Sequence, residues 1–156
     1  MIAFVLFFGS VSISEAQFYT GGNIGFHVDN RGYYFDVAPL FGYRHGILDV
    51  GISPFYSYRD HDIRGTRYSY GNRFFTQLTF FRNVYAHAEF EMTNIEVTVD
   101  GEKQRKWIAG LPLGAGYRHE IAPRTHAYGM VLYDVLLDED SPVTNPIVRF
   151  GVTYSF

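Results

Sequence analysis

The sequence contains no cysteine, only two lysines among its 13 basic residues, and a single tryptophan. The absence of cysteine excludes disulfide bonds and thiolate metal sites. A formal net charge of −3, with Lys103 and Lys106 as the only lysines, leaves no basic patch that would attract nucleic acid. P-loop, dinucleotide, zinc-spacing and nucleophile-elbow motifs are also missing, which removes the enzyme classes that those motifs mark.

No stretch reaches the 18 apolar residues that indicate a membrane-spanning helix. The apolar run Ile2–Phe8 is instead followed by small and polar residues and by Ser14-Glu15-Ala16. This pattern predicts a signal peptide at residues 1–16, cleaved before Gln17. The basic segment with which signal peptides usually begin is missing, so the true start of the precursor is expected upstream of Met1. The alternative is a short buried N-terminal helix or strand. Residues 17–156 then form a single domain.

Aromatic residues make up 19% of the chain, with 13 Tyr and 15 Phe, and there are 16 Gly. This composition favours strands over helices. The chain ends in an alternating segment, Pro146–Phe156, in which every second residue is apolar: Val148, Phe150, Val152, Tyr154 and Phe156. The intervening residues are small, polar or cationic, as in Arg149. A period of two is the period of a β-strand.

The same alternation recurs in segments of about ten residues, the length that a tilted strand needs to cross a bilayer. Eight strands are predicted, at Phe18–Val28, Tyr33–Tyr43, Leu48–Tyr58, Thr66–Phe81, Val84–Met92, Trp107–Tyr117, His126–Leu136 and Pro146–Phe156. The last strand is expected to pair with the first, because an open edge in lipid would leave backbone groups unpaired. The predicted fold class is an all-β, antiparallel, up-and-down transmembrane barrel.

The predicted connections alternate in character along the chain. Sharp turns follow strands two, four and six, whereas more polar or longer connections follow the others, among them a charged loop at Asn94–Arg105 and an acidic loop at Leu137–Asn145. This alternation places both termini on the short-turn side, which is the periplasmic side in outer-membrane barrels. Local irregularity is expected where proline removes a ladder donor and where a polar residue breaks the apolar face: Pro39, Pro54, Pro112, and a bulge at Asn72.

The bulky apolar face of most strands carries rings near both ends, as at Tyr33 and Tyr43 or at Trp107 and Tyr117. Rings at strand ends suit the two membrane–water interfaces, so this face is predicted to point outward. The other face combines glycine with charged residues. Such a face fits the interior of an eight-stranded barrel, which side chains just fill and where charges need partners.

These segments together resemble the small eight-stranded outer-membrane barrels of Gram-negative bacteria, the OmpA/OmpX type. The terminal Phe156, with Val148, Phe150, Val152 and Tyr154 before it, is similar to the assembly signal of that class. The resemblance implies location in the cell outer membrane, contact with its lipid and lipopolysaccharide, and recognition by the barrel-assembly machinery. It does not specify a function, because the class includes anchors, adhesins, conduits and some lipid-modifying enzymes.

The candidate site is a lumen network of paired charges: Arg73, His87, Glu89, Glu91, Arg118 and Arg149. His87, Glu89 and Glu91 share one strand face, and an acid/base or metal constellation is the alternative reading. Lipid A deacylases resemble this fold and use a His-x-Ser pair, but the chain has His126-Ala127-Tyr128. The acidic run Asp138–Asp140 is read as a solvated loop, with a divalent cation as the alternative.

The sequence therefore predicts a non-enzymatic barrel without a cofactor, catalytic residue or metal site. Its role would be structural or accessory, with the lumen plugged by paired charges and with partners contacted through loops or the outer wall. A larger outer-membrane protein complex is one such partner, and nucleic acid is not expected. A narrow pore for water, ions or small solutes is the alternative function, and a lipid-modifying enzyme is a distant third.

Overall fold

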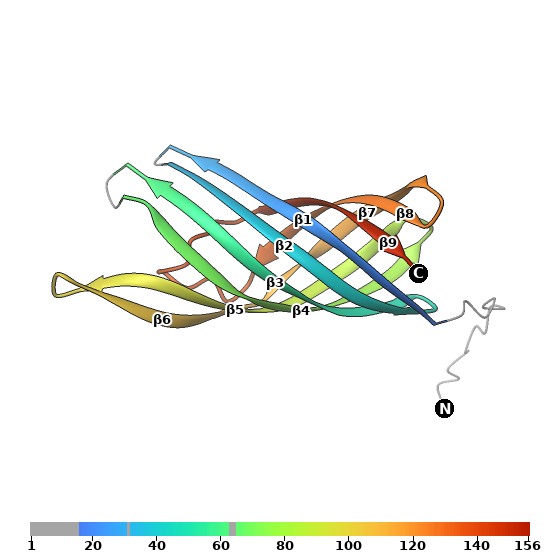
Figure 1. The fold of residues 1–156 in the computed structure, drawn as a ribbon, viewed down its shortest axis with the longest axis horizontal. Helices are drawn as coiled ribbons and strands as arrows, with labels where there is room; N and C mark the ends of the chain where they lie inside the picture. The colour runs from blue at the N-terminus through green and yellow to red at the C-terminus, as the bar shows by residue number, and fades with distance from the viewer. Residues whose placement is uncertain (1–15, 31, 63–64) are drawn as a thin grey trace, which may run out of the picture.

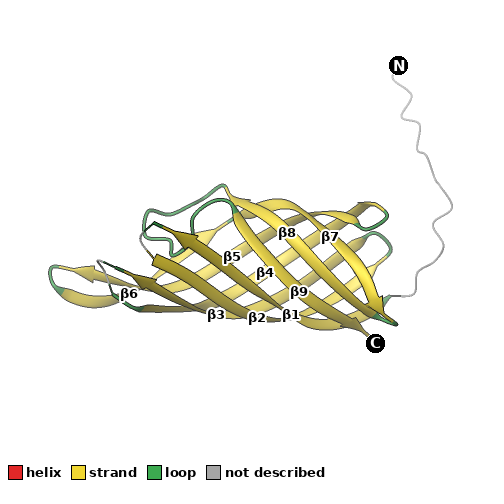
Figure 2. Ribbon diagram, turned by 90° about the horizontal axis from the view of Figure 1, so that it is seen from above, coloured by secondary structure: helices red, strands yellow, loops and turns green. Residues whose placement is uncertain are grey.

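The computed structural model describes residues 16–30, 32–62 and 65–156. The predicted signal peptide therefore lies outside the described residues, apart from Ala16. Nine strands form one antiparallel sheet that curls into a tilted barrel (Figures 1 and 2). They are β1 (Gln17–Asp29), β2 (Gly32–His45), β3 (Leu48–His61), β4 (Arg67–Phe81), β5 (Val84–Val99), β6 (Glu102–Gly110), β7 (Pro112–Ala122), β8 (Thr125–Asp134) and β9 (Ile147–Ser155).

The nine strands occupy eight positions in the wall, because β6 and β7 are two parts of one predicted strand. β5 pairs with both in a single unbroken register, from Glu91 opposite Gly110 to Ala88 opposite Leu113. The β4–β5 and β1–β9 pairs close the ring, and the last pair aligns Tyr19 with Ser155. The predicted eight-stranded antiparallel barrel and its closure by the first and last strands are confirmed.

The three prolines lie where the ladders are interrupted, as predicted. Pro112 has no N–H to donate, and the break between β6 and β7 falls immediately before it. Pro39 and Pro54 share a second gap, between the pairs Val37–Tyr56 and Phe41–Ile52 of the β2–β3 ladder. Neither interruption changes the register, so the same face of each strand points into the lumen before and after the gap.

The bulge predicted at Asn72 is wrong. Asn72 keeps regular partners on both sides, Pro54 in β3 and Met92 in β5. The register shift of the β4–β5 ladder lies instead between Thr79 and Phe81, next to the turn. Asn72 is simply a polar residue on the outward face.

Both ends of the described chain lie at one end of the barrel, together with the short connections after β2, β4 and β7. We call this the turn end, and the opposite end the loop end. The connection from β8 to β9, residues 135–146, lies at the loop end, where an acidic loop was predicted (Figure 2). The predicted alternation of connections is thus reproduced, with one exception.

The exception is the predicted loop at Asn94–Arg105, which is wrong. β5 and β6 continue beyond the barrel as a two-stranded hairpin, and residues 95–106 form what we call the hairpin arm (Figure 1). Its turn is Asp100-Gly101, with φ of 51° and 84°. Two positive φ values at an Asp-Gly pair are typical of the tight turn that matches strand twist, so the high charge of this segment did not make it a loop.

The outward face is apolar and the inward face is polar or glycine-rich. Phe150 is 61% exposed, whereas its neighbour Arg149 is 1% exposed. Aromatic side chains pack against one another at both ends of the outer wall: Phe18–Tyr43 and Tyr154–Phe156 at the turn end, and Tyr33–Tyr58, Tyr58–Tyr68 and Tyr70–Trp107 at the loop end. Two such belts around an apolar band are typical of membrane barrels.

Candidate functional site: the barrel lumen

A buried cluster of charges crosses the middle of the lumen. Arg73 on β4 donates to Asp36 on β2 (Nη2–Oδ2, 2.6 Å) and to Glu91 on β5 (Nε–Oε2, 2.8 Å). Its guanidinium also lies 3.9 Å from the centre of the Phe55 ring. Arg73 and Asp36 are each 1% exposed. We call this cluster, with the residues added below, the mid-lumen network.

Arg149 on β9 completes the network from the other side of the barrel. Its Nη1 donates to both carboxylate oxygens of Glu89 on β5, at 2.8 and 2.9 Å, and its Nη2 lies 3.4 Å from Glu91. Two guanidiniums are thus shared among three carboxylates. Charges removed from water this completely are stable only when paired and hydrogen-bonded, so the network holds opposite walls together.

His87 joins the network through a hydrogen bond to Glu89 (Nε2–Oε2, 3.1 Å). The other ring nitrogen, Nδ1, lies 3.1 Å from the amide nitrogen of Gln77. With the Gln77 amide in this orientation, its nitrogen donates to Nδ1, and Nε2 donates to Glu89. This arrangement orients the Glu89 carboxylate.

The structure brings five of the six predicted network residues together: Arg73, His87, Glu89, Glu91 and Arg149. Arg118 lies apart, toward the turn end. It donates to Asp49 (Nη1–Oδ2, 3.0 Å) and to Thr79 (Nη2–Oγ1, 2.9 Å). The separation arises from the register, because Arg118 follows Tyr117, which pairs with Val84 at the very start of β5.

The predicted network lacks three partners in the lumen: Arg44, Asp36 and Asp49, the last of which accepts from Arg44 and Arg118. Arg44 was placed in a turn, but β2 extends to His45 and the side chain of Arg44 forms two-pronged hydrogen bonds with Asp49 at 2.8 to 3.1 Å. Asp36 lies on the predicted inward face of the strand Tyr33–Tyr43 but is not among the residues of the predicted network. The sequence does contain a signal for Asp36 and Arg44. Every second residue of β2 from Asp36 through Gly42 points inward, and one further step reaches Arg44.

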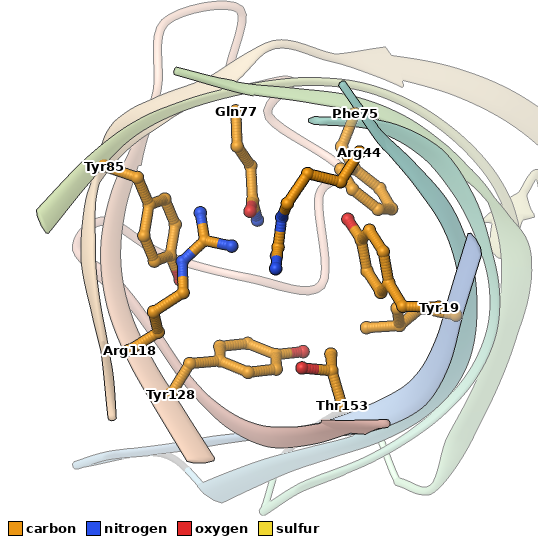
Figure 3. A pocket seen from close by; sticks show the side chains of 9 residues that line it. Tyr19, Arg44, Phe75, Gln77, Tyr85, Arg118, Tyr128 and Thr153 are labelled. Atoms are coloured by element: carbon orange, nitrogen blue, oxygen red, sulfur yellow. The ribbon is translucent and has the colours of Figure 1, made fainter. Parts of the chain in front are cut away.

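Between the network and the turn end lies a small chamber ringed by Tyr19, Tyr85 and Tyr128 (Figure 3). Each ring faces a glycine directly opposite on the neighbouring strand: Gly42, Gly116 and Gly151. A methyl group on any of these glycines would overlap the ring. The glycines therefore make space for rings that lie flat on the inner wall, which explains why small residues alternate on this face.

At the loop end, the connection after β8 is tied to the hairpin arm. Lys106 Nζ lies 2.9 Å from Asp140 and 3.8 Å from Asp138. The hydrogen bond that Lys106 donates to Asp140 raises the pKa of Lys106 above its ordinary value. Part of the acidic run therefore pairs with a lysine. In the described part of the chain, no group of three or more His, Asp or Glu side chains is arranged to hold a metal ion.

Across residues 16–30, 32–62 and 65–156, no helix is long and apolar enough to span a membrane. No protein-family model matches the sequence. No curated protein matches it either.

Several solved structures share the fold. The N-terminal β-barrel domain of Pseudomonas aeruginosa OprF matches with a TM-score of 0.55 and 13% identity, over 91% of this chain and 100% of that one. Neisserial surface protein A matches with a TM-score of 0.54 and 15% identity, over 90% of this chain and 97% of that one. The chain is therefore an eight-stranded barrel of the outer-membrane type, as the sequence predicted.

Proposed function

We propose that the chain is an integral outer-membrane barrel with a structural or accessory role, closed to solute flow and joined to a partner through its hairpin arm. The mid-lumen network carries this proposal. Arg73 and Arg149 reach across the lumen from β4 and β9 to carboxylates on β2 and β5, and both side chains are fully buried. A pore would need these pairs to separate, at the cost of leaving charges unpaired.

The hairpin arm supports the second part of the proposal. From Glu96 to Val99, β5 has ladder partners on β6 alone, because its pairing with β4 ends at Asn94. The arm therefore presents strand edges beyond the barrel wall. Exposed edges with free backbone groups are a recurring way for proteins to add a partner strand.

Two arginines cover the base of these edges. Arg67 donates to the carbonyl of Glu96 (3.1 Å), and Arg105 donates to the carbonyl of Tyr68 (3.3 Å). This protection stops at the base of the arm. The part toward Asp100-Gly101 is the portion best placed to receive another chain.

The orientation in the membrane follows from the same proposal. Short connections lie on the periplasmic side in this class of barrel, so the arm would face outward from the cell. Protease added to intact cells should then cut at the arm and leave the turn end intact. Cleavage only after the outer membrane is opened would reverse the orientation.

Planar-bilayer recording of the purified barrel tests the closed lumen. We expect no steady conductance. A sizeable, sustained conductance would favour the narrow-pore alternative and contradict the closed barrel.

A separate experiment tests the arm. Deleting residues 96–99 together with 102–105 removes four cross-strand pairs while retaining Asp100-Gly101 and the inward and outward parity of what remains. The shortened barrel should fold and insert like the full chain but lose proteins that co-purify with it in mild detergent. Full retention of those proteins would eliminate the arm as the contact surface.

A further inference from the structure

The chamber at the turn end is a cavity of about 20 Å³, lined by tyrosine rings, two arginines, Gln77 and smaller or apolar residues (Figure 3). A cavity needs roughly 10–15 Å³ of this kind of space to hold one water molecule. The chamber therefore accepts one small, compact species. A phosphate or carboxylate group with its substituents would not fit.

The charge around the chamber is unbalanced. Arg44 and Arg118 converge on a single carboxylate, Asp49, which is fully buried. The other lumen carboxylates nearby, Glu89 and Glu91, are committed to Arg73 and Arg149. At this end of the lumen two guanidiniums share one carboxylate, whereas the mid-lumen network has three carboxylates for two guanidiniums, so the positive excess is local to the chamber. An anion would neutralise it.

Unpartnered hydrogen-bonding groups lie around the same space. The hydroxyls of Tyr19 and Tyr85 are buried and have no hydrogen-bond partner among the described residues, and the same holds for Nε of Arg118. The two tyrosines are 4% and 1% exposed. A guanidinium N–H can only donate, and a tyrosine hydroxyl can donate. Buried donors without acceptors are costly, so this set calls for an acceptor.

Figure 3 shows the two guanidiniums and the Tyr19 and Tyr128 hydroxyls turned toward the centre of the chamber. Water could accept hydrogen bonds from these donors but would leave the positive charge in place. A small anion would accept hydrogen bonds from the unpartnered donors and would also neutralise the local positive charge. We propose that the chamber binds one anion of halide size, chloride in the cell, between the Arg44–Arg118 pair and the tyrosine hydroxyls.

The chamber is reached from the turn end. The side chains of Arg44 and Arg118 are 18% and 12% exposed, whereas Arg73 and Arg149 on the other side of the chamber are sealed from solvent. An anion would therefore enter and leave past the two partly exposed guanidiniums without crossing the mid-lumen network. The inference stands apart from the proposed role of the barrel, since a closed lumen and a bound anion are independent.

Bromide is the probe, because its anomalous scattering distinguishes it from water. Crystals of the purified barrel soaked in sodium bromide should show one anomalous peak inside the chamber, within hydrogen-bonding reach of the Arg118 guanidinium and the Tyr85 hydroxyl. Density at that place without an anomalous signal would mean that water alone fills the chamber, and it would overturn the proposal.

A solution experiment uses Tyr85→Phe, a substitution that breaks no protein hydrogen bond. The unfolding temperature of the wild-type barrel should rise with bromide concentration at constant ionic strength, since a ligand of the folded state stabilises it. In Tyr85→Phe, the bromide concentration for half the effect should increase about tenfold, because a hydrogen bond to a charged group is lost.

Tyr154→Phe on the outer wall is the matched control and should respond like the wild type. Equal bromide responses in the wild type and Tyr85→Phe would refute the site. So would a wild-type unfolding temperature that does not change with bromide.

Discussion

Tyr85 on β5 lies directly opposite Gly116 on β7, and its ring covers the place where a side chain of residue 116 would point. The Tyr85 ring thus fills the space on the inner wall that the missing side chain of Gly116 leaves open. The same arrangement recurs at Tyr19–Gly42 and Tyr128–Gly151. Tyrosine rings that lie flat over glycines therefore recur in the packing of this lumen, and each places its hydroxyl group over the glycine of the neighbouring strand.

The first prediction concerns Gly116→Ala. The added methyl group would overlap the Tyr85 ring, and the Arg118 guanidinium, 4.7 Å from the ring centre, limits how far the ring can move away from the wall. Overpacking of this kind costs roughly 1–3 kcal/mol. Thermal unfolding, followed by the gel shift between folded and unfolded barrel, measures the loss.

Gly22→Ala is the control for this substitution, because a methyl group there meets only ordinary contacts at 3.4 Å and beyond. The double variant Gly116→Ala/Tyr85→Ala should show a coupling between the two sites. Additive effects would mean that the ring does not press on residue 116.

The second prediction concerns Arg149→Ala. This substitution leaves the buried Glu89 with a hydrogen bond to His87 and a longer ion pair to Arg73 (3.7 Å), and breaking a buried pair by removing one partner costs about 3–5 kcal/mol. The free energy of unfolding in urea measures it. Lys103→Ala is the matched control: its ammonium contacts Glu96 at 3.2 Å with 74% of the side chain exposed, so we expect little change. A similar, small loss in both variants would contradict the energetic role of the mid-lumen network.

The fold could be predicted from the sequence because a barrel needs the same alternation eight times. Phe150 and Arg149 illustrate the reason: adjacent residues with opposite chemistry can only point to opposite faces, and the structure places them so. The interruptions at the prolines could also be predicted, since the missing N–H is a local property of proline itself. The expectation that termini and short connections share one end is likewise reproduced.

The hairpin arm and the pairing of the charges could not be predicted in the same way. Charge suggested a loop at Asn94–Arg105, although the Asp100-Gly101 pair and the alternation of Ile95, Val97 and Val99 favoured a hairpin. Which arginine meets which carboxylate depends on the tilt of the strands. That tilt places Arg118 beside Asp49, 69 residues away in sequence, rather than beside Glu89.

The third prediction concerns Asp134, which repairs the break in the ladder before Pro112. Its carboxylate accepts from the backbone N–H of Leu111 (2.8 Å) and of Leu136 (3.0 Å). Asp134→Ala would leave both donors unpaired, at a cost of roughly 1–3 kcal/mol for each buried one. Hydrogen exchange at Leu111 should accelerate markedly in this variant.

Asp134→Asn keeps an acceptor oxygen and should protect Leu111 nearly as well as the wild type. Unchanged exchange in Asp134→Ala would show that another group satisfies the Leu111 amide.

The last prediction concerns the chain end. The backbone N–H of Phe156 donates to the carbonyl of Phe18 (3.0 Å), and the carbonyl of Phe156 accepts from the side chain of Gln17 (2.9 Å). Its exposed ring packs edge-on against Tyr154 at 5.7 Å. Only two hydrogen bonds of a long β1–β9 seam involve this residue, so deleting Phe156 should lower the stability of the folded barrel only slightly.

If Phe156 is read by the assembly machinery, its deletion should instead reduce the amount of barrel inserted in the outer membrane several-fold. Refolding of the purified variant into detergent micelles should remain nearly complete, because that process needs no recognition of the terminus. Phe156→Tyr, which keeps an aromatic ring at the same position, is the control and should insert better than the truncated chain. Equal insertion of the truncated and full-length chains in cells would exclude Phe156 as part of the signal. A parallel loss in cells and in micelles would assign its role to closing the seam rather than to recognition.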